Sequence, residues 1–457
     1  MKLLKLKGWT RLLWVILGLA LALVVYGLLQ LIEPVAVQSP RSASGLAFQG
    51  RALLVASDAD MVATAYADAK LDRIPGVEDA LTVLPLPLDP ENPEMLTLPV
   101  SNSVMSWPQI IAISPNGERA YVAEVRSRPA DGIQELESID EMPAGANVTV
   151  VDISNLSQPS ILESVNVGRN PEHLSISPDG RFLAVNLNEP GRELLIVEIQ
   201  PDGTLGQRSY FPMELDGTRR DNRAAIWHPS GRYLAMTQDN NRRIGFYQVQ
   251  ATNGAIAITP VAEPLTIGNH LSNPRFTADG RFLLVPDLKW SLYPNPSLNF
   301  LLNPPGEMIA IQFEPNSGTP ARVVSRVEVG LSPEGFDLSP DNTLIATVNM
   351  RRTYLPSIIL AWRGRSYSSL SLVQFDPESG RLTALDEYGF EGLLPEQAVF
   401  DQTGQALAVV IYNYREAQPR TGAVEFWAVA PGESPQLERT DVKIDVVRGP
   451  HDIRLLP

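Results

Sequence analysis

The chain contains no cysteine among its 457 residues. It therefore cannot form disulfides, bind a metal through thiolates or use a thiol nucleophile. Histidine is also scarce, and the four histidines stand at no paired ligand spacing, which disfavours a metal site. Basic residues number 37 against 52 acidic ones, and the net charge of −15 argues against a general role on nucleic acid.

Signatures of several common enzyme classes are missing as well. We find no G-x-S-x-G elbow, no Walker lysine loop, no G-x-G-x-x-G after a strand and no haem attachment motif. The seven tryptophans recur at no single position of the repeat described next, which argues against a tryptophan-docked quinoprotein. The sequence thus predicts no cofactor and leaves both an enzyme and a binding protein open.

One short phrase recurs six times along the chain. Each copy is a turn followed by an alternating apolar run, which predicts the corner of a β-hairpin. Further apolar runs follow each copy, so each repeat supplies four strands, as in a propeller blade. The copies are SPNGERAYVA (Ser114–Ala123), SPDGRFLAV (Ser177–Val185), HPSGRYLAM (His228–Met236), TADGRFLLV (Thr277–Val285), SPDNTLIAT (Ser339–Thr347) and QTGQALAVV (Gln402–Val410).

A seventh copy is split between the two ends of the chain. PHDIRLLP at Pro450–Pro457 matches PEHLSISP at Pro171–Pro178, and then the sequence stops. The missing remainder, QGRALLVAS, stands at Gln49–Ser57. We therefore expect the last strand to complete a blade begun by the N-terminal strands, which closes an all-β ring of seven blades over residues 47–457.

The repeat also carries the signature V-G-x-x-P-E-x-[apolar]-x-[apolar]-S-P-D-G-R, clearest at Val167–Val185 and Val329–Asn342. On these residues the chain resembles the YVTN-repeat and lactonase-like seven-bladed β-propellers over nearly all of residues 47–457. The tetrapeptide that names the repeat is absent, and the nearest segments read YVAE (Tyr121–Glu124) and LAVN (Leu183–Asn186). The resemblance is specific for the fold and weak for activity, because this architecture hosts enzymes, binders and scaffolds.

The N-terminal region has a different composition from the repeats. Leu12–Ile32 is an uncharged run of 21 residues, long enough as a helix to cross a bilayer. Lys2, Lys5, Lys7 and Arg11 precede it and orient the N-terminus toward the cytoplasm. We expect a cytoplasmic segment at 1–11, a transmembrane anchor at 12–32, a linker at 33–46 and a propeller on the extracytoplasmic, periplasmic side of the cell membrane. A cleavable signal peptide is the alternative.

Propeller architecture, as the resemblance implies it, places the first strand of each blade along a central channel. Aligned after the proline of the P-E-x signature, the blades bring carboxylate, imidazole, guanidinium and amide groups to one channel mouth, where such groups shift each other's pKa values. In relatives with lactonase activity, acidic, His and Arg side chains of this region are the implied catalytic groups. The acid–base candidates are His173, Glu334, Glu396 and His451, Arg223 is an anion clamp, and Glu172, Asn273 and Asp452 are further ligand contacts. The alternative is an ordinary wet channel lined by polar groups.

A second candidate surface is the loop after the second strand of the fifth blade, Met350–Leu370. It combines arginines with aromatic residues and contains no acid, a combination that suits an anionic, sugar-like or protein partner. The candidate ligand contacts are Arg351, Arg352, Tyr354, Trp362, Arg363 and Arg365. Blades one, four and six also carry long loops here, whereas blades two and three have short ones, so the rim is built up on one side. The alternative is that these aromatic side chains only pack the loops together.

These observations favour a membrane-anchored, extracytoplasmic propeller that binds a ligand or an envelope protein through its rim. A lactonase-like hydrolase with an acid–base site at the channel mouth is the alternative function.

Overall fold

The computed structural model describes residues 2–31, 35–42, 47–71, 73–213, 222–252, 254–315, 319–356, 367–413 and 420–457. Seven antiparallel sheets follow one another in the described chain, six of four strands and one of five. Innermost strands of most neighbouring sheets contact one another, and residues of the innermost strands of all seven sheets surround one central space. The sheets are the predicted blades, and the all-β, seven-bladed propeller is confirmed.

The first three blades follow directly in sequence. Blade 1 consists of β4 (Ile111–Ile113), β5 (Arg119–Ala123), β6 (Asn147–Asp152) and β7 (Ser160–Asn166), and blade 2 of β8 (Pro171–Ile176), β9 (Phe182–Leu187), β10 (Leu194–Ile199) and β11 (Leu205–Phe211). Blade 3 consists of β12 (Ala225–Trp227), β13 (Tyr233–Gln238), β14 (Arg243–Thr252) and β15 (Ala255–Pro260), with β16 (Leu265–Thr266) as an extra strand on β14.

The next three blades repeat the pattern. Blade 4 consists of β17 (Arg275–Phe276), β18 (Phe282–Asp287), β19 (Glu307–Gln312) and β20 (Arg322–Glu328), and blade 5 of β21 (Pro333–Leu338), β22 (Leu344–Asn349), β23 (Tyr367–Phe375) and β24 (Leu382–Glu391). Blade 6 consists of β25 (Ala398–Phe400), β26 (Ala406–Ile411), β27 (Thr421–Ala430) and β28 (Gln436–Val447).

Blade 7 joins the two ends of the propeller. Its inner strand is β29 (Pro450–Leu456), and its other strands are β1 (Ala52–Ser57), β2 (Ala80–Pro85) and β3 (Leu96–Pro99). The pairing of β29 with β1 is antiparallel and places Ala52 opposite Leu456 and Val55 opposite Ile453. This confirms the predicted closure and leaves no free inner edge at the seam.

The recurring turn explains why each inner strand ends where it does. In blade 2 the Ser177 hydroxyl donates to Asp179 and accepts the amide of Phe182, which begins the next strand. Gly180 has a φ of +73°, in the left-handed region that costs glycine nothing. Thr277 and Asp279 repeat the hydroxyl–carboxylate bond in blade 4. The Ser/Thr-Pro/Ala-Asp-Gly phrase is therefore a hydrogen-bonded corner that starts the second strand of a blade.

The hydrophobic core lies between neighbouring blades rather than at one centre. Successive residues of β1 point to opposite faces, so Leu53 and Val55 pack toward blade 6 whereas Leu54 and Ala56 pack toward blade 1. Each middle strand is covered on both faces, which accounts for its continuous apolar run.

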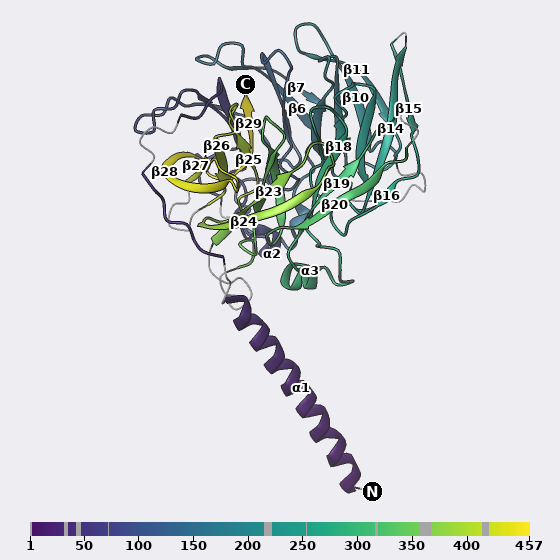
Figure 1. The fold of residues 1–457 in the computed structure, drawn as a ribbon, viewed down its shortest axis with the longest axis vertical. Coiled ribbons are helices and arrows are strands. Elements are labelled where there is room, and N and C mark those ends of the chain that lie inside the picture. The colour runs from purple at the N-terminus through teal and green to yellow at the C-terminus, as the bar shows by residue number, and fades with distance from the viewer. Residues whose placement is uncertain are drawn as a thin grey trace.

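The N-terminal helix α1 (Lys2–Leu31) extends away from the propeller, on the side where the short helices α2 (Ala65–Asp68) and α3 (Pro296–Leu302) lie (Figure 1). Within the described residues no helix has the length and apolar character to cross a membrane. The anchor at 12–32 stays a prediction.

Part of the predicted linker lies against the propeller. Over residues 35–42 the chain forms parallel bridges from Val37 to Gly389 in β24 and from Arg41 to Thr440 in β28. Gln38 N–H donates to Gly389 O at 2.7 Å, and Arg41 N–H donates to Arg439 O at 2.9 Å. This stretch therefore covers the outer edges of blades 5 and 6 instead of hanging free.

Ring closure makes a specific prediction for stability. Ile453 of β29 is fully buried between blades 6 and 7, so Ile453→Ala should lower the free energy of unfolding by about 2–5 kcal/mol in urea titrations. Leu162→Ala, on outer strand β7 where the side chain is 43% exposed, is the control and should stay within about 0.5 kcal/mol of wild type. Equal losses in the two variants would contradict a core role for β29.

Candidate functional site

The structure brings Glu334, Glu396 and His451 together at the start of the inner strands, but it does not leave them at an open mouth. All of the following are 3% exposed or less: Glu172, His173, Glu334, Glu396, His451 and Asp452. Two connections of blade 7 cover them, residues 58–79 between β1 and β2 and residues 100–110 between β3 and β4. We call these two segments the cap. The expected channel mouth is therefore covered. Residues 58–79 lie outside the aligned repeat, whereas Pro108, Gln109 and Ile110 belong to it and still form part of the cover.

The cap fills the axis at this end of the channel. The carbonyl oxygen of Pro108 accepts hydrogen bonds from three different blades: from Asn273 Nδ2 at 2.8 Å, from Gln397 Nε2 at 3.4 Å and from Arg454 Nη2 at 2.8 Å. The adjacent amides of Ile110 and Ile111 donate to Asp452 Oδ2. Segment 100–110 is thus held at the centre by groups that converge from around the ring.

Buried acids hold the other cap segment in place. Asp58 accepts the amide of Val104 through Oδ2, and Asp79 accepts the amides of Ala59 and Asn102. Burial and the neighbouring Asp60 raise the pKa of Asp58 to about 6. The two cap segments are therefore tied to one another through carboxylates.

Arg223 supplies a positive charge beside these buried residues. We call Glu172, Arg223, Glu334, Glu396, His451 and Asp452 together the buried ring. Its Nε lies 3.7 Å from Glu172 Oε2, and its Nη1 donates to the carbonyl of Met105 at 3.2 Å. The guanidinium also lies 4.9 Å from the ring centre of Trp107, within cation–π range. Asn188 Nδ2 donates to the second oxygen of Glu172 at 3.1 Å. The predicted anion clamp is thus already fixed between an acid and the cap.

Hydrogen bonds determine the tautomer of His451. Asn102 Nδ2 donates to Val100 O at 2.8 Å and to Ser57 O at 3.1 Å, so its Oδ1 faces His451 Nε2 at 2.8 Å as an acceptor. The proton of a neutral His451 therefore lies on Nε2, and Nδ1 presents its lone pair toward Glu396 Oε2, 4.0 Å away. Burial lowers the pKa of His451 to about 3, so the imidazole is neutral at pH 7.

Glu334 and Glu396 hold their protons near neutral pH. Burial raises the pKa of Glu334 to about 8, with the charge of Arg223 acting in the opposite direction. Burial, followed by Glu334, Asp58 and Asp452, raises the pKa of Glu396 well above its usual range. Neither oxygen of Glu396 accepts a hydrogen bond from any described residue. The ring therefore presents a carboxylic acid, a guanidinium and a neutral imidazole, which together can move a proton beside a bound carbonyl group.

His173 does not join this group. Its ring is fully buried against the backbone of Ala225, and burial followed by the charge of Arg454 lowers its pKa to about 3. No described contact links His173 to Glu334 or Glu396, so nothing in the geometry supports an acid–base role.

The arginine-rich loop of blade 5 is packed inward where it is described. Arg351 pairs with Glu387 at 3.2 Å and lies 4.8 Å from the ring centre of Tyr367. Arg352 donates to Asn303 O, and Tyr354 donates to Phe300 O within an aromatic cluster that includes Trp290. All three loop residues are buried, which corrects the expectation of an exposed binding surface, because the loops of blades 4 and 5 pack on each other. Trp362, Arg363 and Arg365 lie outside the described residues.

Sequence reasoning missed several residues of the site. Tyr66, Asn102 and Arg126 reach the ring from the cap and from the long loop of blade 1. Burial, followed by Glu396 and Glu334, raises the pKa of Tyr66 well above its usual range, and burial lowers the pKa of Arg126 although Glu172 opposes this. The sequence did contain a signal for the cap. Residues 58–79 lie between the second and third strands of the split blade, as the long loops do in blades 1, 4 and 5.

No protein-family model matches the chain, and no curated protein matches it in sequence. Solved structures do match in fold. The periplasmic gluconolactonase of Pseudomonas aeruginosa has a TM-score of 0.59 at 18% identity, over 89% of this chain and 99% of that one. A putative 6-phosphogluconolactonase of Bacteroides fragilis has a TM-score of 0.59 at 14% identity, over 91% and 100%. At these identities the likeness concerns the fold. The protein is a seven-bladed β-propeller whose structural neighbours are lactonase-like propellers.

Proposed function

We propose that the protein is a lactonase-like hydrolase that opens the lactone of a polyhydroxy acid at the buried ring. The observation that carries the proposal is Glu334, which is buried within electrostatic reach of Arg223 and whose pKa burial raises to about 8. A group that exchanges a proton near neutral pH next to a fixed cation suits acyl transfer from a neutral ester. The fold shared with propellers that carry gluconolactonase names adds support.

The reaction assigns one role to each group. Arg223 polarises the lactone carbonyl and stabilises the oxyanion that forms when water adds. Glu334, in its carboxylate form, takes the proton of that water and returns it to the ring oxygen as the carbon–oxygen bond breaks. The product is a hydroxy acid, which ionises and releases one proton to solvent. His451 and Glu396, held by Asn102 and by the cap, orient the water.

Access to this site is through the cap. Glu334 is closed off in the structure, so a sugar lactone enters when segment 100–108 is displaced from the ring. This displacement breaks the three hydrogen bonds to Pro108 O and the hydrogen bond that Arg223 donates to Met105 O.

Attachment to a membrane remains part of the proposal from the sequence. Residues 12–25 of α1 expose large apolar side chains, among them Trp14 and Leu21. Exposed apolar surface of this extent is ordinarily covered by lipid or by a partner protein. An extracytoplasmic location and an envelope partner stay predictions.

The raised pKa of Glu334 predicts a pH dependence of stability. Its folded pKa lies above the usual 4.5, so between that value and about 8 unfolding releases a proton, and the free energy of unfolding falls as pH rises. Glu334→Gln removes this slope, so the variant should gain stability relative to wild type across the window, by about 1.4 kcal/mol per pKa unit at most. Urea midpoints from pH 5 to 8 measure this. Glu328→Gln, an exposed change on β20, should run parallel to wild type, and a parallel curve for Glu334→Gln would refute the raised pKa.

The activity itself is tested with the full chain and gluconolactone in a pH-stat, after subtraction of spontaneous hydrolysis. Wild type should release acid with a rate that rises toward pH 8, because the carboxylate form of Glu334 is the active one. Glu334→Gln should lower kcat roughly 10²–10⁴-fold, the usual contribution of a general acid–base group. Glu328→Gln should leave the rate unchanged. A wild-type rate no faster than that of Glu334→Gln would reject the hydrolase.

A further inference from the structure

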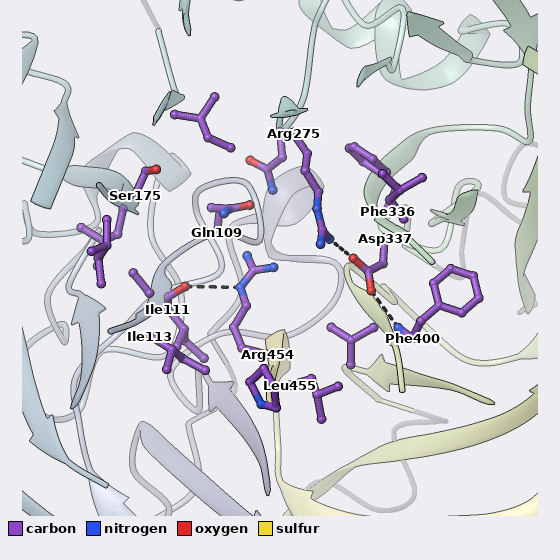
Figure 2. A pocket seen from close by; sticks show the side chains of 18 of the residues that line it. Gln109, Ile111, Ile113, Ser175, Arg275, Phe336, Asp337, Phe400, Arg454 and Leu455 are labelled. Carbon is purple, nitrogen blue, oxygen red and sulfur yellow. Dashed lines mark hydrogen bonds and ion pairs between the residues drawn. The ribbon is translucent and has the colours of Figure 1, made fainter. Parts of the chain in front are cut away.

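The channel also contains a cavity at the far ends of the inner strands, and cap residue Gln109 lines part of it. It has a volume of about 600 Å³ and is lined by the inner strands of all seven blades and by the turns that follow them. Figure 2 shows Arg275, Arg454 and Gln109 pointing into the middle of this space. The residues proposed above for hydrolysis do not line it.

Arg275, at the start of β17, is only partly neutralised by its partner. Nη1 pairs with Asp337 Oδ1, and Asp337 Oδ2 accepts the amide of Phe400 at 2.7 Å. In the described structure Nε and Nη2 of Arg275 have no hydrogen-bond partner. Desolvation, and then the positive charge of Arg454, lower the pKa of Arg275 to about 10, although 44% of the Arg275 side chain is exposed.

Arg454, on β29, offers a second donor to the same space. Its Nη2 lies 3.1 Å from Asp452 Oδ1 and donates to Pro108 O, and its Nε donates to Ile111 O at 3.3 Å. Its Nη1 makes no hydrogen bond to the residues that the structure describes. An anion placed between the two guanidinium groups would therefore meet unused N–H donors from both sides.

Charge and polar groups narrow the ligand class. Asp337 and Asp452 each contact one nitrogen of an arginine and offset most of the positive charge, and Asp401 at the rim is occupied by amide and hydroxyl donors of its own turn. A singly charged ligand therefore fits better than a multiply charged one. Asn273 lines the cavity, and its buried Oδ1 has no hydrogen-bond partner within the described chain, so it can accept from a ligand hydroxyl.

We propose that this cavity binds a small hydroxycarboxylate, with the carboxylate between Arg275 and Arg454 and the hydroxyl groups toward Asn273 and Gln109. The proposal does not depend on the hydrolase, because it uses other residues at the other end of the channel.

Isothermal titration of the full chain with sodium gluconate tests the site. We expect saturable binding that Arg275→Gln weakens at least tenfold, because half of the carboxylate clamp is removed. Arg275→Lys should recover part of the affinity. Arg281→Gln is the matched control: it lies in the next turn of the same blade, outside the cavity, and should bind as wild type does. Absence of binding to wild type, or equal binding by Arg275→Gln, overturns the proposal.

Two further arms define the ligand chemistry. Sorbitol, which has the hydroxyl groups without the carboxylate, should not bind, and inorganic phosphate should bind more weakly than gluconate. Equal affinity for sorbitol or phosphate contradicts the assignment to a hydroxycarboxylate. Asp337→Asn removes the charge that competes for Arg275 and should tighten gluconate binding severalfold, a gain that loss of folding cannot produce. Weaker or unchanged binding by Asp337→Asn also counts against the site.

Discussion

The pairing of β29 with β1 is the interaction on which the rest of the molecule depends. It closes the ring, and it also sets the direction of each side chain on the last strand. His451 and Ile453 face blade 6, where they meet Glu396 and the core between blades, whereas Asp452 and Arg454 face blade 1 and hold its first amides and carbonyls. The period of two along one strand thus supplies residues to the buried ring and to the open cavity together. A register shift of one residue would exchange the two sets and destroy both.

The two ends of the channel differ in whether their charged groups are paired with groups of opposite charge. At the capped end, carboxyl groups are buried without equivalent cations, and burial keeps Glu334 and Glu396 protonated near neutral pH. At the open end each arginine has an aspartate partner. Buried acids without partners cost stability, and apolar side chains of similar volume would hold the sheets together better. Groups with displaced pKa values that gather in one place are typical of a site that moves protons, which is why we assign the chemistry to the capped end.

Sequence periodicity was sufficient for the blade count and the split blade, because both follow from where each turn recurs. The convergence of Arg223, Glu334, Glu396 and His451 needed the propeller architecture that the resemblance implied, and that architecture also placed His173 in the group. The cap was missed because residues 58–79 lie outside the repeat, and because alignment of Pro108, Gln109 and Ile110 with the other blades does not show that they cross the channel axis. The rim was misjudged for a related reason: Tyr354 is buried by Trp290 and Phe300, from a loop some sixty residues earlier, and no local pattern encodes that contact. Arg275 and Arg454 stand at strand positions where an arginine ordinarily points to solvent, so only the assembled ring shows that they share a cavity.

The Arg454 side chain contacts both the cap and the cavity. Arg454 donates to Pro108 O through Nη2, which helps to hold the cap, and directs Nη1 toward the cavity. Removing it would loosen the cap and empty half of the carboxylate clamp together, so its loss cannot separate hydrolysis at the ring from binding in the cavity. Within the described chain the hydrogen bond of Arg275 goes to Asp337 rather than to the cap, and Glu334 does not line the cavity. Variants of Arg275 and of Glu334 therefore test binding in the cavity and hydrolysis at the buried ring independently.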